Sequence, residues 1–394
     1  MNYRRKEYYL LEERMRPTEP NRIQMVVGPR QVGKTTLVLQ WLRTVQEPNN
    51  LRYFTGDAQI GSSWIEGAWN AARIACRADQ STQYLVLDEI QKTTRWSEVV
   101  KRLWDEDRAQ GLDVRVVLLG SAQLLLDKGL TESLAGRGER IHLSHWRFSE
   151  MNEAFGLSAE EFVWFGGYPG AMDYWTDESR WKAYVRESLV ETAITQDVLM
   201  MHRVLKPALL RQTFEMAIHY AGQTLSITKM VGQLQDAGNT TTLSEYLNLL
   251  NQAQLIAPLH KYAGAYVRKR ASSPTFHLYN PAIRNAYRPG GRLDLRNAPS
   301  LWGRAVEIAV GAHLLSYQSP EFEVTTWREG DFEVDFVVKT PRGLFTLEVK
   351  SGRDKASGLT RFQEQFNPTR TLLVGPGGIP WQDFLRLEPV DWAV

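Results

Sequence analysis

Nine consecutive residues near the N-terminus have the types and spacing of a loop that binds phosphate. A β-rich run at residues 22–27 precedes the loop, and an apolar helical pattern follows it. The loop reads Gly28, Pro29, Arg30, Gln31, Val32, Gly33, Lys34, Thr35 and Thr36. It fits the pattern G-x-x-x-x-G-K-[ST] in the strand-loop-helix context that this pattern requires. We expect its backbone N–H groups to wrap a phosphate chain, Lys34 to reach the terminal phosphates and Thr35 to ligate Mg²⁺.

Two acids at the end of a second apolar strand are the expected partners of this loop. Residues 84–87 are apolar and lead into Asp88 and Glu89. Asp88 would hold Mg²⁺ through water, and Glu89 would orient or deprotonate the attacking water. A P-loop kinase or a GTPase needs no glutamate here, whereas a hydrolytic ATPase of the additional-strand class does. The predicted cofactors are therefore ATP and Mg²⁺, and a Gly-Lys turn without a ligand is the alternative.

Two further residues are candidates for the same site. A third apolar strand, residues 114–119, runs into Ser121, which we expect to sense the γ-phosphate or simply to cap a helix. Arg137 and Arg140 follow, and either fits an arginine finger that completes the site of a neighbouring subunit. We predict a homo-oligomer in which Arg137 acts in trans, with a surface arginine as the alternative.

The segments between these residues alternate between strand and helix. Helical patterns at residues 62–78 and 96–109 separate the apolar strands, and further strands are expected at 50–57 and 139–143. Such alternation predicts a parallel sheet with helices on both faces and the nucleotide at the carboxyl ends of the strands.

The C-terminal third carries a second group of acids, on two predicted strands joined by a tight turn. Residues 332–339 and 344–350 both alternate between apolar and polar side chains. If the turn is symmetric, Asp335 lies opposite Glu348. The other face of this hairpin would then be the core face, with Phe332, Val334, Phe336, Val338, Phe345, Leu347 and Val349.

Two facing carboxylates repel each other unless a cation lies between them. Hard oxygen ligands suit a divalent ion, so Asp335 and Glu348 are the predicted metal ligands. The same register places Glu333 opposite Lys350, and Lys350 would position a water or stabilise charge on a phosphate. The alternative is a salt bridge between Glu333 and Lys350 in a domain that binds DNA without cutting it.

The middle of the chain predicts a helical lid and then a winged helix-turn-helix. Residues 158–199 are mostly helical in pattern. Three helices are then expected at residues 209–221, 226–235 and 241–254, and two strands at 255–262 and 276–279. Three helices followed by a β-hairpin are typical of a winged helix.

The tip of that hairpin interleaves charged and aromatic residues. Lys261, Arg268, Lys269 and Arg270 are the predicted contacts to a DNA backbone. The polar face of the third helix lacks Arg and Lys, which argues against base readout by the helix itself. A winged helix that serves only as a spacer is the alternative.

Several of these segments together resemble one family. They are residues 28–36, 85–89, 120–121, 134–137, 147–150 and 166–169. They are similar to segments of prokaryotic AAA-type ATPases that carry a C-terminal domain of formerly unknown function. The pattern Asp335, Glu348-x-Lys350 resembles the restriction-endonuclease-like (PD-(D/E)xK-type) fold, in which a preceding helix often supplies a further acid, here Glu307 as another metal ligand.

The resemblance and the element pattern together imply an α/β chain with four parts. These are an AAA-type P-loop ATPase core at residues 1–155, a helical lid at 156–205, a winged helix-turn-helix at 206–285 and an α/β restriction-endonuclease-like domain at 286–394.

The composition excludes several classes of protein. With 394 residues, 43% hydrophobic and 23% charged, the chain is neither disordered nor a disulfide-rich mini-protein. Cys76 is the single cysteine, which excludes an internal disulfide and fits a reducing compartment. Because no apolar run could span a membrane and the N-terminus lacks a secretory pattern, we expect a cytoplasmic protein without a membrane partner. The net charge of +2 means that DNA contact must come from local patches.

These observations predict an Mg²⁺-dependent ATPase that works as an oligomer and binds and remodels or processes DNA, such as branched DNA in recombination or repair. The alternative is a slow ATPase that acts as a nucleotide switch on a protein partner in defence or stress signalling, with an inert nuclease-like domain. Stimulation of ATP turnover by DNA distinguishes the two.

Overall fold

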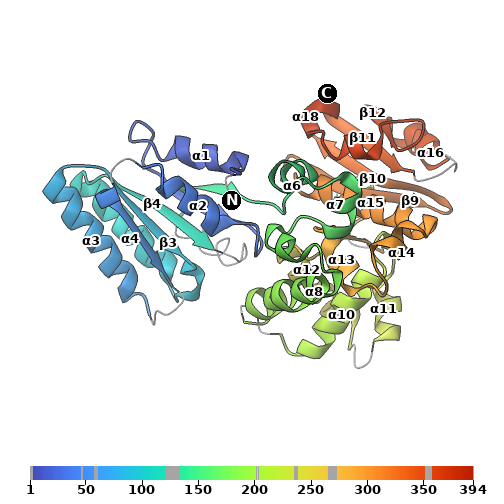
Figure 1. Ribbon diagram of the computed structural model, residues 1–394, viewed down its shortest axis with the longest axis horizontal. Coiled ribbons are helices and arrows are strands. Elements are labelled where there is room, and N and C mark those ends of the chain that lie inside the picture. Colours follow the sequence, from blue (N-terminus) through green and yellow to red (C-terminus); the bar gives the residue numbers. More distant parts are fainter. Residues whose placement is uncertain are drawn as a thin grey trace. The chain divides into compact units, whose positions relative to one another are not determined.

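The computed structural model describes residues 3–45, 48–56, 61–120, 134–200, 202, 204–234, 238–264, 273–350 and 357–393. The chain divides into two compact units, the first ending at Ser144 and the second beginning at His145 (Figure 1). Helix α6 (Phe148–Phe155) packs against α7 (Ala159–Phe165), so it belongs to the second unit. The division therefore comes earlier in the chain than the boundary expected at residue 155.

In its described part, the N-terminal unit has a parallel sheet of five strands. They are β1 (Ile23–Val27), β2 (Leu51–Thr55), β3 (Gln83–Asp88), β4 (Val114–Gly120) and β5 (Gly138–His142), and their order across the sheet is β2-β3-β4-β1-β5. Every neighbouring pair is parallel, which confirms the predicted sheet. Strand β4 thus lies between β1, which leads to the glycine-rich loop, and β3, which ends in Asp88.

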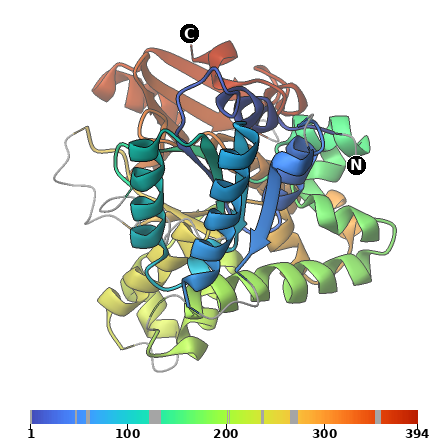
Figure 2. The same ribbon diagram turned by 90° about the vertical axis from the view of Figure 1, so that its left-hand side faces the viewer.

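Helices cover both faces of this sheet (Figures 1 and 2). Helices α1 (Lys6–Arg14) and α2 (Lys34–Leu42) lie on one face, and α3 (Ser63–Asp79) and α4 (Trp96–Gln110) on the other. The short helices η1 (Pro48–Asn50) and η2 (Ile90–Lys92) precede β2 and follow β3. Because both faces are covered, every residue of β1 and β4 is buried rather than every second one.

The second unit begins with helices. After α6 and α7 come η3 (Pro169–Tyr174), α8 (Glu178–Ala183), η4 (Tyr184–Val190), α9 (Glu191–Ala193) and η5 (Ile194–Leu199). The last four follow one another without a break, so residues 178–199 form one helix with two π-helical stretches. The helical character expected for residues 158–199 is confirmed.

A segment of helices and short strands follows. The helices are α10 (Pro207–His219), α11 (Ile227–Gln233) and α12 (Thr240–Gln252), and the strands are β6 (Gln223–Thr224), β7 (Ile256–Leu259) and β8 (Thr275–Leu278). The strands pair antiparallel in the order β6-β8-β7. Helix α12 buries its apolar face as its periodicity predicted, with Leu243, Tyr246, Leu247 and Leu250.

The remaining chain forms a mixed sheet with helices around it. The strands are β9 (Glu323–Glu329), β10 (Phe332–Thr340), β11 (Gly343–Val349) and β12 (Arg370–Val374), in the order β12-β11-β10-β9. Strands β11 and β12 are parallel and the other pairs antiparallel. The helices are α13 (Pro281–Tyr287), α14 (Arg292–Arg296), α15 (Pro299–Leu315), α16 (Ser357–Phe366), α17 (Trp381–Phe384) and α18 (Pro389–Trp392).

The β10–β11 hairpin has the predicted register but not the predicted core face. Phe336 lies opposite Leu347 as expected. On the other edge of β10, however, the pairing with β9 shifts between Val334 and Val337, which marks a β-bulge. An extra residue reverses the alternation of side chains, so Val334 joins Val337 in a cluster with α16. The expectation that Phe332 and Val334 share a core face with Phe336 is therefore wrong, and Phe332 is 40% exposed.

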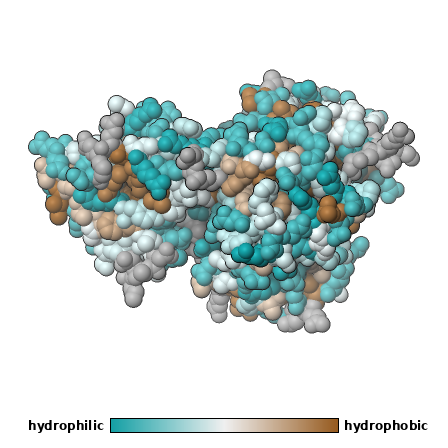
Figure 3. Space-filling view, viewed as in Figure 1, coloured by the Kyte–Doolittle hydropathy of each residue, from teal (hydrophilic) through white to brown (hydrophobic). Residues whose placement is uncertain are grey.

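No helix within the described ranges is both long and apolar enough to cross a membrane. On the face drawn in Figure 3, hydrophilic residues predominate on each unit and apolar residues are scattered among them. Isolated apolar side chains of this kind are normal on a protein surface.

Candidate nucleotide site and acidic centre

The glycine-rich loop forms the turn from β1 into α2, at the carboxyl edge of the N-terminal sheet. A Cβ atom on Gly28 would stand 2.1 Å from the carbonyl oxygen of Leu143, so only glycine fits there. Gly33 caps α2 in the left-handed conformation, with φ 89°. Lys34 is buried, and its Nζ donates to the carbonyl oxygens of Gly28 (3.0 Å) and Pro29 (2.6 Å). The ammonium is thus held against the loop that is expected to carry the phosphates.

The other loop residues differ in burial. Val32 is fully buried and anchors the loop to the unit, whereas Arg30 is half-buried and Thr36 is exposed. Gln31 has φ 62°, a left-handed conformation that is uncommon outside glycine. A tightly turned loop with one buried anchor is what a backbone that wraps a phosphate requires.

The predicted magnesium partners are in contact with each other. The Oγ1 atom of Thr35 donates to Oδ2 of Asp88 at 2.9 Å. The same oxygen accepts a hydrogen bond from the hydroxyl of Tyr53 on β2, and Oδ1 accepts from the backbone N–H of Glu89 (2.8 Å). A hydroxyl and a carboxylate at this separation fit a hydrated Mg²⁺ bound between the loop and β3. Tyr53 was not predicted, because an aromatic residue in a strand carries no recognisable motif.

Glu89 leaves the end of β3 in a left-handed conformation, with φ 52°. Its Oε2 atom accepts a hydrogen bond from Nε2 of Gln91 (2.8 Å) and forms an ion pair with Lys92 (3.5 Å). A non-glycine residue in this region is uncommon and is often found at functional sites. The carboxylate is therefore fixed beside Asp88, as a group that orients water should be.

Arg137 lies at the amino ends of the strands, which is the end of the sheet away from the glycine-rich loop. Its carbonyl oxygen accepts from the N–H of Ile23, the first residue of β1, so Arg137 stands at the amino ends of the strands and the glycine-rich loop at their carboxyl ends. Its guanidinium donates to both carboxylate oxygens of Asp105 on α4, at 2.8 and 2.9 Å. These hydrogen bonds lower the pKa of Asp105 below its ordinary value. Arg137 therefore cannot serve the site of its own chain.

Several predicted residues lie outside the described residues. These are Ser121 of the nucleotide site and Arg268, Lys269 and Arg270 of the predicted wing. Of the predicted DNA contacts Lys261 is described: it is half-buried, and its Nζ lies 5.9 Å from the centroid of the Trp327 ring on β9.

The acids of the second unit form one electrostatic centre. Burial and the nearby carboxylates of Asp335 and Glu333 raise the pKa of Glu307, on α15, well above its ordinary value. Burial also raises the pKa of Asp335 to about 7, although Oδ2 accepts a hydrogen bond from the N–H of Val349 (2.7 Å). Burial and the charge of Asp335 raise the pKa of Glu348 to about 8. The structure thus brings the predicted acids near one another, where they repel.

The acidic centre suits a cation that takes some ligands from these carboxylates and the others from water or phosphate oxygens. The Oε2 atom of Glu348 is buried and has no hydrogen-bond partner among the described residues. Within the described ranges, however, no three His, Cys, Asp or Glu side chains gather closely enough to hold a metal by themselves. Asp335 and Glu348 are thus suited to an Mg²⁺ that takes its other ligands from water or phosphate oxygens, as Mg²⁺ commonly does. Glu333 lies opposite Arg328 of β9, and its expected pairing with Lys350 lies beyond the paired ladder.

Two arginines beside this centre were missed from the sequence. Arg284 on α13 is mostly buried, and burial together with Arg304 and Arg288 lowers its pKa to about 10. Its Nη1 has no hydrogen-bond partner among the described residues. Arg304 lies one helical turn before Glu307 on α15, a spacing that places both on one side of the helix and that could have identified it.

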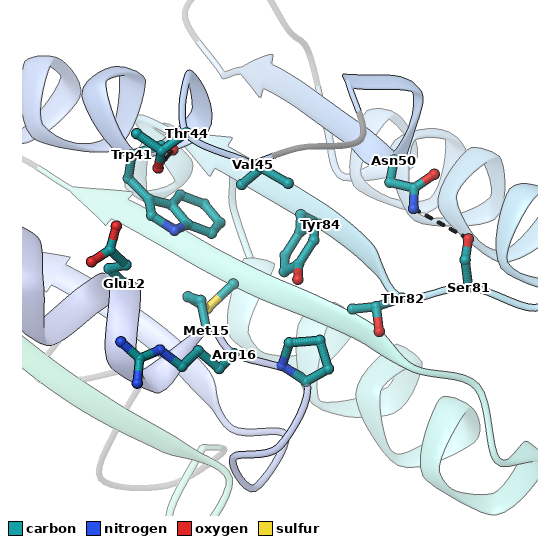
Figure 4. Close-up of a pocket in the computed structure, with 11 residues that line it drawn as sticks. Glu12, Met15, Arg16, Trp41, Thr44, Val45, Asn50, Ser81, Thr82 and Tyr84 are labelled. Carbon is teal, nitrogen blue, oxygen red and sulfur yellow. Dashed lines mark hydrogen bonds between the residues drawn. The ribbon is translucent and has the colours of Figure 1, made fainter.

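A separate hollow of about 590 Å³ lies in the N-terminal unit (Figure 4). Trp41 and Tyr84 meet edge to face in it, with ring centroids 5.6 Å apart. Thr44 follows the end of α2, and Asn50 and Ser81 precede β2 and β3. The hollow is therefore at the amino ends of the strands and is distinct from the nucleotide loop.

The polar face of α12 borders a hollow. Ser244, Asn248 and Asn251 line a hollow of about 420 Å³ together with Glu323 of β9. Asn251 also accepts a hydrogen bond from the hydroxyl of Tyr279 (2.9 Å). The expectation that the helix itself does not read bases stays a prediction.

Comparisons with known families divide the chain in a similar way. A family described as AAA domain matches residues 20–152. Two families described as domains of unknown function (DUF8612 and DUF4143) match residues 157–294 and 302–380. The N-terminal unit is thus similar in sequence to AAA domains, and the second unit is similar to two domains whose descriptions name no activity.

Relatives and solved structures are more distant. Uncharacterised proteins of Mycobacterium bovis and Mycobacterium tuberculosis are each 26% identical over 383 residues, which cover 93% of this chain and 80% of theirs. The RuvB Holliday junction branch migration motor of Thermotoga maritima matches with a TM-score of 0.36 and 17% identity, over 64% of this chain and 87% of its own. AMPPCP-bound DnaA from Aquifex aeolicus has a TM-score of 0.33 and 11% identity, over 64% and 90% of the two chains. TM-scores and sequence identities this low carry no argument about function. The function is therefore argued from the geometry of the site.

Proposed function

We propose that this protein is an Mg²⁺-dependent ATPase of the AAA type that couples hydrolysis to the binding and remodelling or processing of DNA, as an oligomer in the cytoplasm. One observation carries the proposal. The hydroxyl of Thr35, at the end of the glycine-rich loop, contacts Asp88 at the end of β3, with Glu89 beside it. A magnesium ligand pair and a water-activating acid thus converge on the loop that is expected to hold the phosphates.

The order of the sheet favours hydrolysis over phosphate transfer to a small molecule. Strand β4 separates β1 from β3, as in the additional-strand class of ATPases. Thr35 and Asp88 would hold Mg²⁺ beside bound ATP, where the ion would neutralise charge on the phosphates. Lys34 would then leave the carbonyl oxygens of Gly28 and Pro29 for the terminal phosphates, and Glu89 would accept a proton from water.

The second unit supplies the reasons to propose DNA as the partner. The element order α10-β6-α11-α12-β7-β8 supports a winged helix-turn-helix. The mixed sheet, with Asp335 on β10 and with Glu348 and Lys350 at the end of β11, supports a restriction-endonuclease-like domain. Raised pKa values, and a buried carboxylate oxygen with no hydrogen-bond partner among the described residues, are consistent with a metal-dependent phosphodiester site.

The proposal is tested by ATP hydrolysis with and without DNA. Single-stranded, duplex and four-way-junction DNA are added to the full chain while phosphate release is followed, and the same DNA is run on a gel. We expect at least one form to stimulate turnover severalfold. A slow rate that no DNA changes, without cleavage, would instead support a nucleotide switch that acts on a protein partner.

We also predict that Arg137→Ala lowers ATP hydrolysis by about 1000-fold while nucleotide binding stays unchanged, because its guanidinium stabilises transferred phosphate in a neighbouring subunit. The measurement is complementation. Arg137→Ala subunits keep Glu89, and Glu89→Gln subunits keep Arg137, so mixing the two inactive proteins should restore part of the activity.

Asp105→Asn is the matched control for Arg137→Ala. It removes the carboxylate that holds Arg137 in the isolated chain and leaves the arginine in place. Hydrolysis should therefore stay at or above the wild-type rate. If Arg137→Ala retains full activity, or the mixture stays inactive, Arg137 is a surface residue paired with Asp105 and the role in trans is wrong.

A further inference from the structure

A cationic hollow of about 420 Å³ lies where the α10–β8 segment meets the C-terminal sheet. Lys229 comes from α11, Lys261 follows β7, and Arg328 stands on β9. None of the described residues that line this hollow is acidic. Positive charge from three separate elements therefore converges on one space.

The floor of this hollow is made of hydroxyl groups. The Oγ1 atoms of Thr224 and Thr275 are 2.8 Å apart, and those of Thr275 and Thr326 are 3.4 Å apart. Thr275 and Thr326 are only 6% and 7% exposed. Hydroxyls on the floor and ammonium or guanidinium groups at the rim are the donors that bind phosphate oxygens in protein–DNA contacts.

The hollow is held in shape by backbone hydrogen bonds. Lys261 and Thr326 form a β-bridge that joins β7 to β9. The N–H of Tyr262 donates to the oxygen of Thr326 (2.7 Å), and the N–H of Thr326 donates to the oxygen of His260 (3.1 Å). The two sheets are thus connected along the floor, so the donors are positioned before any ligand binds.

The two exposed cations at the rim have no acidic partner in the described part of the chain. Among the described residues, neither Lys229 nor Arg328 has a carboxylate oxygen within 4.0 Å, although Nε of Arg328 donates weakly to the oxygen of Gly330 (3.4 Å). Cations that are not held in close ion pairs within the protein are available to bind phosphate.

The same hollow lies beside the acidic centre. Arg328 stands opposite Glu333 on the neighbouring strand β10. Gly222 is two residues before Thr224, and a Cβ placed on Gly222 would be 3.3 Å from Oε1 of Glu307. A chain of phosphates bound over the hydroxyls would therefore continue towards Glu307, Asp335 and Glu348.

We propose that this hollow binds consecutive phosphate groups of a DNA strand and leads the strand to the acidic centre. The inference rests on the proposed DNA binding and adds where the phosphate backbone of the DNA is bound. The binding residues lie along the strands of both sheets rather than at the tip of the predicted wing. The contacts are to phosphates, so the grip is independent of base sequence.

The test compares two double variants of the full chain by fluorescence anisotropy with a labelled DNA strand. Lys229→Ala with Arg328→Ala removes the rim of the hollow. Lys339→Ala with Arg342→Ala removes one exposed lysine and one exposed arginine from the far end of β10 and its turn, as the matched control. We expect the first pair to weaken binding roughly tenfold, and to lower the slope of log affinity against log salt by about 2. The control pair should match the wild type, and thermal unfolding should show that all three proteins are folded.

The outcomes separate this inference from the proposed function. If the wild type binds DNA and the Lys229 and Arg328 variant binds it equally well, the hollow is not the grip, whereas DNA binding itself stands. Titration calorimetry with inorganic phosphate forms the second arm. Tight binding of free phosphate that the variant loses, with unchanged DNA binding, would make the hollow a site for a free anion and overturn the proposal. If the wild type binds no DNA while it hydrolyses ATP, the inference falls together with the DNA part of the proposed function.

Discussion

Replacing Glu89 by Gln should reduce ATP hydrolysis by at least about 100-fold, because a positioned general base contributes about 10²–10⁴-fold to such a reaction. The amide keeps the size of the side chain but cannot accept a proton from water. Glu89 contacts Asp88 only through its backbone N–H, so the pair of Thr35 and Asp88 should survive the substitution. Nucleotide and Mg²⁺ binding should therefore remain close to the wild-type values.

The measurement is the turnover rate at saturating ATP together with the Kd of a fluorescent ATP analogue. Glu98→Gln is the matched control, since Glu98 is an exposed glutamate of α4 in the same unit and pairs with Arg95 at 2.8 Å. Its rate should stay within about twofold of the wild type. Hydrolysis by Glu89→Gln at a near-normal rate would mean that the water is activated elsewhere, and the assignment of Glu89 would have to be abandoned.

The arrangement of the candidate nucleotide site could be predicted because its parts are local in sequence. The loop at residues 28–36 contains its own turn, anchor and cation, and β3 delivers Asp88 and Glu89 at its end. Alternating strands and helices then fix which edge of the sheet these residues share. Tyr53 could not be foreseen, because its contact with Asp88 depends on β2 lying next to β3.

The acidic centre was only partly predictable, for a different physical reason. The turn between β10 and β11 sets their register, so Asp335 and Glu348 were foreseen as neighbours, and the charge of Asp335 does act on Glu348. The bulge in β10 depends on its pairing with β9, a strand that leaves no trace in the spacing of the hairpin itself. Arg284 approaches from α13, far away in sequence, and only the packing of the whole unit reveals it. The pairing of Arg137 with Asp105 on α4 likewise depends on the packing of elements that are distant in sequence, so the spacing of residues could not reveal it.

We also expect a large fall in the stability of the metal-free protein as the pH rises from about 4 to about 8. In an unfolded chain Asp and Glu titrate near pH 4. Burial and mutual repulsion raise the pKa of Asp335 to about 7 and that of Glu348 to about 8 in the folded chain. The folded state thus holds more protons across this window. The stability that these groups contribute is complete below about pH 4 and is lost as the pH rises through their folded pKa values.

A divalent ion should reverse this loss, because it binds the ionised carboxylates. Saturating Mg²⁺ or Mn²⁺ at about 100 times its Kd adds roughly 2.7 kcal/mol, or about 5–10 °C in the Tm of a unit of this size. We expect this gain near pH 8 and little gain near pH 5.5, where protons compete with the metal. Thermal unfolding without nucleotide, with and without metal at both pH values, is the measurement.

Variants then assign the effect to particular carboxylates. Asp335→Asn and Glu348→Gln should each raise the Tm of the metal-free protein near pH 8, since one repelling charge is gone, and should abolish the gain from metal. Glu321→Gln, an exposed glutamate just before β9, should change neither. All three variants keep Thr35 and Asp88, so metal bound at the nucleotide site cannot account for a difference among them.

The pH dependence of stability and the gain from metal test different conclusions. A fall in stability with pH that Glu348→Gln relieves requires only that the carboxylates repel each other in the folded chain. A gain from metal that the same substitution removes requires that they also bind a cation. If the first is found without the second, the acids repel and are tolerated without a metal. The sheet would then support DNA binding through the hollow beside Arg328, and cleavage by this centre would be excluded because a phosphodiester site of this kind depends on the ion.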